Sequence, residues 1–586
     1  MGGTGGAGGH AGGNSGTSGS GGVGIISTGN STIHNSGTIS GGVGAGGRAN
    51  AIELSGGNNT LVLQVGSAIT GNVLATSTDG SDLISAEASS TITGNLTSTG
   101  TVSVGTASAP NSVLTVTGNY TQGSGGIFKT TVYSDSSYGR LVVNGTANIA
   151  GSAYVNVLTA NTLANGQTWS GVVSAANITN NFSSVADNSA LFDFTSILNS
   201  NQIDFVVSAA STAGVSNAVS TAGISQAAGA ARVLDIWVNS GTITGDTANV
   251  VTAFGQLGNL HQVSQAAAQT LPLLTAGSNS AITNLQHQVQ GVFQNRLGGL
   301  RGLSSGDGQL SDGKLWAKTF GSFADQDNRK GIAGYDGNAW GLVFGGDGEY
   351  NKNTRIGAAF TYAKSDIDAS TDVSGTRQNA TIDSYQLSLY GSHDLATGSF
   401  IDAQFDVGQS NVDGRRDIRF GSLDRTARSD YDAWMVHIGA AFGKTLDVSA
   451  ATSFTPSIRA DYTWVHSDSY KETGAGALNL NVDSDTADEL VLGVDGRVNH
   501  HLSENSRLTA SIGVGYDVIN DRSSLTSVYA GSPGLSFKTY GLEQSPWLVR
   551  GGLGVVVATR TAVLSSRLAT TLKGALISST RRPPPR

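Results

Sequence analysis

The chain has 586 residues, a formal net charge of −9 and only 13% charged residues, so it offers no basic surface for nucleic acid. It contains no cysteine, which excludes a disulfide scaffold and thiolate chemistry and suits a chain that crosses an oxidising compartment unfolded. Glycine reaches 82 residues and proline only 8, a composition that predicts an all-β protein with many turns.

Residues 1–50 form a low-complexity segment of Gly, Ser, Asn and Thr. Residues 42–47 (GVGAGG) match GxGxxG, but no strand–turn–helix pattern surrounds them, so we do not assign a dinucleotide site. The opening MGGTGGAGGHAGG lacks the basic and apolar regions of a signal peptide, and we expect an exported form to carry its address elsewhere.

Residues 51–210 are a succession of short β runs separated by Gly, Asn and Asp turns, as in NTLVLQVGSAITGNV and SSTITGNLTSTGTVSVG. The pattern is typical of a parallel β-helix, in which each rung buries its apolar face by stacking on the next. The segment 113–157 is denser in apolar and aromatic residues, which predicts a terminal, capping set of rungs.

Residues 211–310 change to a helical pattern, and residues 281–300 carry one apolar stripe. The stripe consists of Leu285, Val289, Val292, Phe293 and Leu297. Ser280 is the expected N-cap, and Gly298–Gly299 the expected stop. About 20 helical residues span roughly 30 Å, the thickness of a bilayer core. The helix is too polar to face lipid, which leaves two alternatives: it threads a wet pore, or it packs on a soluble domain.

Residues 311–586 alternate systematically between apolar and polar residues, a pattern that predicts β-strands. We count ten runs, most of them long enough to cross a bilayer at a tilt. They cover residues 314–324, 338–350, 354–365, 380–393, 397–410, 430–444, 454–467, 486–500, 505–517 and 546–558. In the run 401–407 (IDAQFDV), apolar residues occupy every odd position.

The connections decide what each face of these strands meets. Long polar segments follow the odd-numbered runs (326–338, 408–430 and 467–486), whereas short turns follow the even-numbered ones. Long loops at one end and tight turns at the other are the layout of an outer-membrane barrel, and a soluble sandwich has no reason to sort its loops in this way. We therefore expect Ile401, Ala403, Phe405 and Val407 to face lipid, and Asp402, Gln404 and Asp406 to face the lumen.

Aromatic residues near the ends of the runs are expected at the membrane interfaces. They are Trp316, Tyr350, Tyr390, Trp464 and Tyr516.

Taken together, β-rungs, a capping β segment, a pore-length helix and a barrel opening with KLWAKTFGSFADQD resemble a classical (monomeric) autotransporter. The resemblance implies a twelve-stranded translocator in the bacterial outer membrane and a passenger at the cell surface or released from it. It makes 113–157 an autochaperone-like segment and 281–300 the helix left in the pore. It also implies outer-membrane lipid, the barrel-assembly machinery and periplasmic chaperones as partners, and a host surface or other cells as what the passenger meets.

The C-terminus departs from this pattern from about residue 555. The residues RLATTLKGALISST show no alternation, and the chain finishes on STRRPPPR, whose prolines cannot donate to a closing ladder. Reading the codons two bases out of frame permits R-Y-D-x-E-G-R-x-D-F-x-N, which resembles the family's penultimate strand. We therefore hypothesise a frame error near 554–558, and we expect the chain as written not to close a barrel.

The sequence contains no hydrolase motif and no metal-binding motif, so we expect no catalytic, cofactor or metal site. Asp325, Asp327 and Asn328 fail the EF-hand spacing and are interpreted as a solvated loop, and His500–His501 as a solvent-facing turn. Arg415, Arg416, Arg419, Arg425 and Arg428 form a basic loop, for which we favour solvation over a grip on acidic lipid or on the passenger.

Two functions remain open for the passenger. The first is an adhesive or display module, since the rungs carry no catalytic constellation. The second is a hydrolase passenger, an esterase or a protease, which needs a nucleophile–base pair; His10 and His34 are the only histidines before residue 200. Some autotransporters cut their own linker at paired asparagines, but Asn284 and Asn295 are isolated, so we do not expect self-cleavage there.

Overall fold

The computed structural model describes most of the chain. The described residues are 2–4, 10–11, 14–15, 19–158, 163, 165–210, 214–241, 243–272, 277–300, 315–369, 376–395, 398–503, 506–558 and 563–573.

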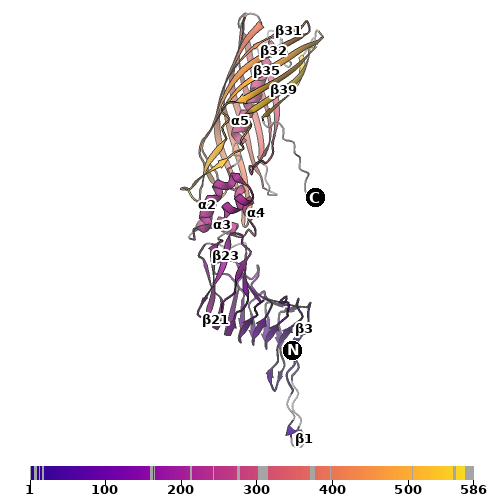
Figure 1. Cartoon of the computed structure of the whole chain (residues 1–586), viewed down its shortest axis with the longest axis vertical. Helices are drawn as coiled ribbons and strands as arrows, with labels where there is room; N and C mark the ends of the chain where they lie inside the picture. The colour runs from indigo at the N-terminus through magenta and orange to yellow at the C-terminus, as the bar shows by residue number, and fades with distance from the viewer. Residues whose placement is uncertain are drawn as a thin grey trace. The chain divides into compact units, whose positions relative to one another are not determined.

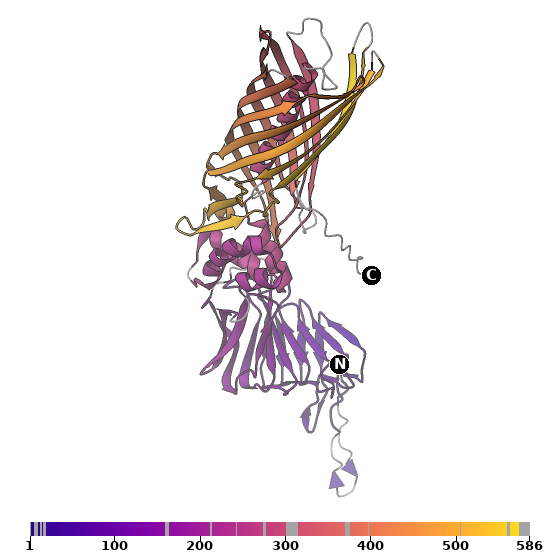
Figure 2. The same ribbon diagram turned by 45° about the horizontal axis from the view of Figure 1, so that its top comes forward.

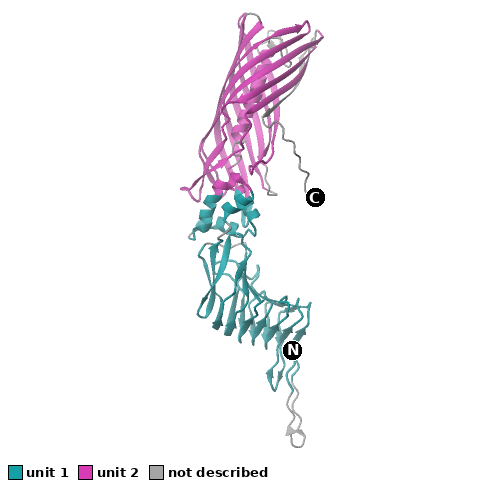
Figure 3. Ribbon diagram, viewed as in Figure 1, with its two compact units in different colours: residues 1–222, 231–267, 419–424 teal, residues 223–230, 268–418, 425–586 magenta. Residues whose placement is uncertain are grey.

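The chain forms two compact units, each with its own kind of sheet (Figure 3). The first contains residues 1–222, 231–267 and 419–424, and the second contains residues 223–230, 268–418 and 425–586. The first unit is built on parallel strands and the second on antiparallel ones. The predicted combination of a parallel β-helix and an antiparallel barrel is therefore confirmed.

The first unit is a three-sided parallel β-helix with five rungs of three strands each (Figure 2). The rungs are β3 (Ile25–Ser27), β4 (Thr32–Asn35) and β5 (Thr38–Ser40); β8 (Ile52–Leu54), β9 (Thr60–Leu63) and β10 (Ala68–Thr70); β11 (Val73–Ala75), β12 (Leu83–Ala86) and β13 (Ser90–Thr93); β14 (Leu96–Ser98), β15 (Thr101–Val104) and β16 (Val113–Val116); β17 (Tyr120–Gln122), β18 (Ile127–Val132) and β19 (Arg140–Asn148). Residues in register stack into buried columns, such as Ile52, Val73, Leu96 and Tyr120. Stacking therefore buries the apolar face of each rung, and the first rung begins at Ile25, inside the segment assigned to low complexity.

Short elements flank the first rungs. They are the hairpins β1 (His10–Ala11) with β2 (Asn14–Ser15) and β6 (Val43–Gly44) with β7 (Gly47–Arg48).

A ladder of asparagines joins one corner of successive rungs. Asn95 N–H donates to Asn72 Oδ1 (2.9 Å), and Asn119 N–H donates to Asn95 Oδ1 (2.8 Å). The preceding Gly71 and Gly94 have φ of 116° and 152°, a region that favours glycine. The sequence signal for this ladder is the repeat ITGNV, ITGNL and VTGNY at residues 69–73, 92–96 and 116–120, which the loose spacing of the β runs had concealed.

Residues 113–157 contain the last rungs of the β-helix, as expected of a terminal set, but an antiparallel layer and not these residues covers its end. Strands β21 (Thr168–Thr179), β23 (Phe192–Asn199) and β24 (Gln202–Ala209) form this layer, whereas β20 (Ser152–Val157) and β22 (Val185–Asp187) continue one face of the helix. Trp169, Phe192 and Phe205 are fully buried there. Residues 113–157 belong to the stacked rungs, because the apolar density that suggested a cap serves stacking in this segment.

Short helices follow the β-helix. They are α1 (Val215–Thr221), the 3₁₀ turn η1 (Ser225–Ala227), α2 (Ala228–Asn239), α3 (Gly245–Gly255) and α4 (Leu260–Gln269). Phe254 of α3 packs against Phe420, with ring centroids 4.6 Å apart, within the first unit. No helix among the described residues is long and apolar enough to cross a membrane.

The second unit is an antiparallel sheet whose strands follow one another in chain order and curl into a barrel (Figure 1). The strands are β25 (Trp316–Gln326), β26 (Tyr335–Asn351), β27 (Thr354–Ala369), β28 (Gln378–Asp394), β29 (Ser399–Phe420), β30 (Leu423–Lys444), β32 (Thr452–Ser467), β35 (Asp485–Ser503), β36 (Ser506–Asp517), β39 (Trp547–Ala558) and β40 (Val563–Lys573), with the short β31 (Leu446–Ser449) beside β32. Each of the ten predicted runs corresponds to one of these strands.

The barrel is apolar on the outside and polar on the inside. In the stretch 401–407, the side chains of Ile401 and Phe405 are 44% and 42% exposed, whereas Gln404 and Asp406 are buried. This is the reverse of a soluble sheet, and it confirms the predicted assignment of lipid and lumen faces.

Two expectations about the barrel strands are wrong. Residues 408–430 are not a loop, because β29 and β30 run on as a hairpin of two 22-residue strands that leaves only Gly421 and Ser422 between them. Residues 563–573 form an eleventh long strand, β40, which pairs with β39 along its length. Backbone pairing needs no alternation of side chains, so the missing pattern did not prevent this strand.

Within the described residues, β25 and β40 are the unpaired edges of the sheet. The end STRRPPPR lies outside the described part of the chain, whereas residues 554–558, near which we hypothesise a frame error, form the end of β39.

The asparagine ladder predicts the effect of Asn95→Ala. The substitution removes the acceptor of the Asn119 N–H and should lower the free energy of unfolding of the β-helix by about 1 kcal/mol. Urea denaturation of residues 19–210 measures this loss. Asn95→Asp is the matched control, because it keeps an acceptor oxygen in place; an equal loss in both variants would contradict the role of the ladder.

Asp187 in β22 predicts a pH dependence. Burial raises the pKa of its carboxyl group from 3.8 to about 6. The folded state therefore holds the proton more tightly than the unfolded state, and its contribution to stability is complete below about pH 4 and lost as the pH rises through about 6. Asp187→Asn should flatten this decline, which urea midpoints at pH 4 and pH 8 compare; an unchanged decline would assign it to other groups.

Candidate functional site

The candidate site is the lumen of the barrel, which contains the helix α5 (Gly277–Leu300) (Figures 1 and 2). At its start, Asn279 Nδ2 donates to Asp485 Oδ2 (2.9 Å) at the first residue of β35, directly after a long loop, and Tyr431 Oη within β30 donates to Ser278 Oγ (3.0 Å). At its end, Arg296 reaches Asp347 on β26, near the short turn before β27. The helix therefore runs from the long-loop mouth of the barrel to the short-turn mouth, and of the two alternatives the pore is correct.

The predicted apolar stripe of α5 packs against one side of the barrel wall. Leu285, Val289, Val292, Phe293 and Leu297 are all buried in one cluster with Trp316, Val343, Ala359, Ala363 and Tyr390. Trp316 and Tyr390 are thus lumenal and not at the membrane interface, because their parity in β25 and β28 points them inward. Gly345 and Gly357 lie beside them on the neighbouring strands and leave room for the two rings.

A polar contact next to these rings fixes the end of the helix. Arg296 Nε donates to Asp347 Oδ2 (2.8 Å), and its guanidinium lies 5.5 Å from the Trp316 ring. Tyr390 Oη donates to the same carboxylate (2.9 Å) and accepts from Trp316 Nε1 (2.7 Å). Every group in this buried set has a partner, which such charges require.

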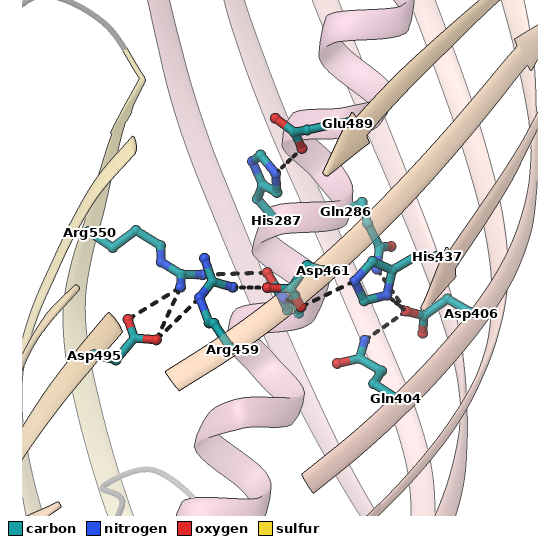
Figure 4. A network of polar contacts seen from close by, with 11 residues as sticks. Gln286, His287, Gln404, Asp406, His437, Arg459, Asp461, Glu489, Asp495 and Arg550 are labelled. Atoms are coloured by element: carbon teal, nitrogen blue, oxygen red, sulfur yellow. Dashed lines mark hydrogen bonds and ion pairs between the residues drawn. The ribbon is translucent and has the colours of Figure 1, made fainter. Parts of the chain in front are cut away.

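A second network crosses the middle of the lumen (Figure 4). Asp406 Oδ2 accepts from His437 Nδ1 (2.6 Å) and from Gln404 Nε2 (2.8 Å). His437 Nε2 lies 3.6 Å from Asp461, which pairs with Arg459. The chain of charges continues from Arg459 to Asp495 (3.2 Å) and from Asp495 to Arg550 (3.3 Å).

The wall of the barrel supplies all the charges of this network, and the helix supplies neutral amides. Gln286 Nε2 donates to Asp406 (2.7 Å), and Gln290 bonds to Asp461. The same carboxylates are also paired with His437, Arg459 and Arg550, which lie on the wall and not on the helix. One ion pair in this region does involve α5, between His287 Nε2 and Glu489 (2.7 Å).

The helix leaves part of the lumen open. A polar cavity of about 130 Å³ lies beside it, lined among others by His287, Asn295, Arg459, Asp495 and Arg550. A space of this size and polarity has room for several waters. The lumen therefore combines space for water with charged side chains on its wall.

The other residues singled out in the sequence lie outside this network. Ser280 is not the N-cap, because α5 begins at Gly277, and Gly298–Gly299 lie in its last turn. Asn328 Oδ1 accepts from Gly334 N–H (2.6 Å), so it closes its own loop, and no group of metal ligands occurs in the described residues. His500 lies inside β35 and not in a turn; its Nδ1 is 2.9 Å from Thr452 Oγ1. Sequence reasoning missed His437, Arg550 and Arg296. For His437 on β30 and Arg550 on β39, the inward parity of the strand position was the available signal; for Arg296 on α5, it was the neighbouring apolar stripe.

The basic loop is the largest correction at the site. Arg416 is 1% exposed and is ion-paired with the buried Glu472, so the solvated interpretation is wrong for it. Arg415 pairs with Asp417 and Arg419 with Asp424. Arg425 Nη1 donates to the Ala475 carbonyl (2.7 Å).

Comparison with known proteins identifies the kind of barrel. The family described as "Autotransporter beta-domain" matches residues 315–564. Outer membrane protein B of Rickettsia prowazekii is 28% identical over 250 residues, which cover 38% of this chain and 15% of that protein. Esterase EstA of Pseudomonas aeruginosa is 26% identical over 293 residues, covering 48% of this chain and 42% of that protein.

Two further matches are more distant or partial. The extracellular serine protease of Serratia marcescens is 25% identical over 238 residues, covering 40% of this chain and 22% of that protein. The solved translocator domain of the autotransporter NalP from Neisseria meningitidis has a TM-score of 0.39 and 18% identity, covering 51% of this chain and 93% of that one. The chain thus spans less than half the length of these curated relatives.

The lumenal contacts predict the effect of Arg296→Met. The substitution breaks a buried ion pair, which costs about 3–5 kcal/mol when the remaining charge is stranded, but Arg355 also reaches Asp347 (3.2 Å) and should keep the loss near the lower bound. We expect a lower thermal midpoint of the barrel by gel heat-modifiability, and a larger conductance in planar bilayers as α5 loosens. Arg355→Met, on a partly exposed arginine, should do less; equal conductance in both variants and the unaltered chain would show that Arg296 does not hold the helix.

Proposed function

Since the chain carries an autotransporter β-domain and belongs to the autotransporters of the bacterial outer membrane, we propose that its β-helix is an adhesive or display module. The β-domain supports secretion of a passenger at the outer membrane, and the passenger here is the β-rich N-terminal part.

The observation that carries this function is the direction of α5 in the pore. The helix enters at the long-loop mouth, and in outer-membrane barrels the long loops face the outside of the cell. The residues that precede α5 in the chain therefore start from the outer mouth. This supports a passenger that stays on the surface while its linker remains in the pore.

The surface of the β-helix supports binding rather than catalysis. The face formed by β5, β10, β13 and β16 presents columns of small polar residues in register: Thr91 beside Thr115, and Thr70 beside Thr93. These side chains point outward, while Ile69 and Ile92 between them are buried. A regular face of this kind, uncharged on β5, β10, β13 and β16, suits contact with an extended surface.

The alternative is a hydrolase passenger, supported by the relatives named as an esterase and a serine protease. It needs a nucleophile next to a base. His34 is exposed on β4, and its partner in register on β9 is Val62. The activity of either relative is a property of that protein, and this chain would need a comparable pair elsewhere.

The partners follow from the same proposal. Outer-membrane lipid contacts the apolar outside of the barrel, which includes Ile401, Phe405 and Trp434. We propose the barrel-assembly machinery and periplasmic chaperones as assembly partners, and a host surface or other cells as what the passenger contacts.

Because the chain has no cysteine, surface display is tested with single-cysteine variants. Val65→Cys, at an 83% exposed position of the β-helix, should react with a membrane-impermeant maleimide on intact cells. Asn353→Cys, in the short turn after β26, should react only after lysis. Protection of the Val65 position on intact cells would contradict display, and hydrolase activity that is lost with His34→Ala would favour the alternative.

A further inference from the structure

Two long loops of the barrel fold into a small sheet with its own core. The sheet comprises β33 (Tyr470–Lys471), β34 (Leu480–Val482), β37 (Ser524–Tyr529) and β38 (Ser536–Tyr540), in that order. Leu478, Leu480, Val482 and Tyr529 are almost fully buried. Barrel loops need no such core to connect two strands, so this sheet has a further role.

Next to the sheet, Arg416 and Glu472 form a buried ion pair. Their side chains are 1% and 2% exposed, and Arg416 Nε donates to Glu472 Oε1 (3.2 Å). The other carboxylate oxygen accepts from Leu480 N–H (2.8 Å). A buried pair of this kind is stable only when its remaining donors and acceptors are also satisfied.

The linker of the chain supplies part of that satisfaction. Arg416 Nη1 donates to the main-chain carbonyl of Gln269 (2.8 Å), and Nη2 donates to the carbonyl of Leu478 (3.1 Å). The next linker residue, Thr270, has its Oγ1 2.6 Å from Tyr529 Oη. Gln269, Thr270 and Tyr529 are all buried. The linker is thus held at two successive residues, seven residues before α5 begins.

Another long loop and the small sheet contact the linker at a second place. Lys330, in the loop after β25, accepts a hydrogen bond at its carbonyl from Ser225 Oγ (2.8 Å). Gly229 approaches β38 so closely that a Cβ would lie 2.5 Å from the Lys538 carbonyl. The sheet is also tied to the pore helix, since Tyr470 stacks on Tyr431, whose hydroxyl donates to Ser278.

We propose that this loop sheet and Arg416 form an exit clasp, a binding site for the main chain of linker residues 269–270. Without the linker, the Nη1 donor of Arg416 has lost its carbonyl, and the buried ion pair is incomplete. The clasp closes only around a linker that has arrived, and it then holds the linker at the outer mouth. This role is independent of what the passenger binds.

The test measures access to the linker in the full chain, with the protein in isolated outer membranes. Gln269→Cys leaves the main-chain carbonyl in place and should react with a maleimide at least about tenfold more slowly than Val65→Cys, because burial protects it. Adding Arg416→Met should raise the rate at position 269 by about tenfold. Adding Arg415→Met, on the neighbouring and partly exposed arginine, should leave it unchanged.

Arg416→Met strands the charge of Glu472 and can weaken the barrel by itself, so the double variant Arg416→Met/Glu472→Met separates the two effects. It removes both charges, and the clasp proposal expects the cysteine at position 269 to remain reactive while gel heat-modifiability shows an assembled barrel. Slow labelling in the assembled double variant would overturn the proposal. Labelling at position 269 as fast as at position 65 with Arg416 intact would overturn it as well.

Discussion

The barrel depends on one constraint: backbone N–H and C=O groups that cross the hydrocarbon must be paired inside the protein, because lipid offers them no partner. Long antiparallel strands in chain order meet this constraint. Their alternation then sends Ile401 and Phe405 outward and Asp406 inward, and so puts polar side chains into an enclosed lumen. Polar side chains that are buried in the lumen must in turn be paired with one another. The lumenal network therefore follows indirectly from the need to pair the backbone.

The way the lumen pairs its charges explains how it can hold a helix without depending on it. Asp406, Asp461 and Asp495 are balanced by His437, Arg459 and Arg550, all on the wall. Along this network α5 adds only amides, which exchange easily with water or with another polar segment. The ionic contacts of α5 are few and local, at His287 and Arg296. A wall that pairs its own charges can accommodate different polar segments in the lumen, which suits a β-domain that supports secretion of a passenger.

The sequence predicted those features that repeat. The ten runs, the inside-out stretch 401–407 and the apolar stripe of α5 follow from periods of two and 3.6 residues. It failed where tertiary contacts override a local pattern. The local sequence predicts that Arg416 is a solvated charge in a loop. It is instead buried by Glu472 and Gln269, which lie 56 and 147 residues away in the chain, and no local pattern shows such partners. Trp316 and Tyr390 were predicted at the membrane interfaces because they lie near strand ends, although the alternation along their strands already pointed them into the lumen.

The β-helix, which precedes the barrel in the chain, satisfies its backbone groups by a different route. Each rung pairs only with its neighbours, so the fold grows by addition and needs a first edge. The antiparallel pair β23 and β24 is local, with residues 192–209 closing on themselves, and β24 pairs with β21, which pairs with β19. This C-terminal layer is the part of the β-helix nearest in sequence to α5. Being both local and nearest in sequence to α5, it is the edge on which the remaining rungs can stack in turn.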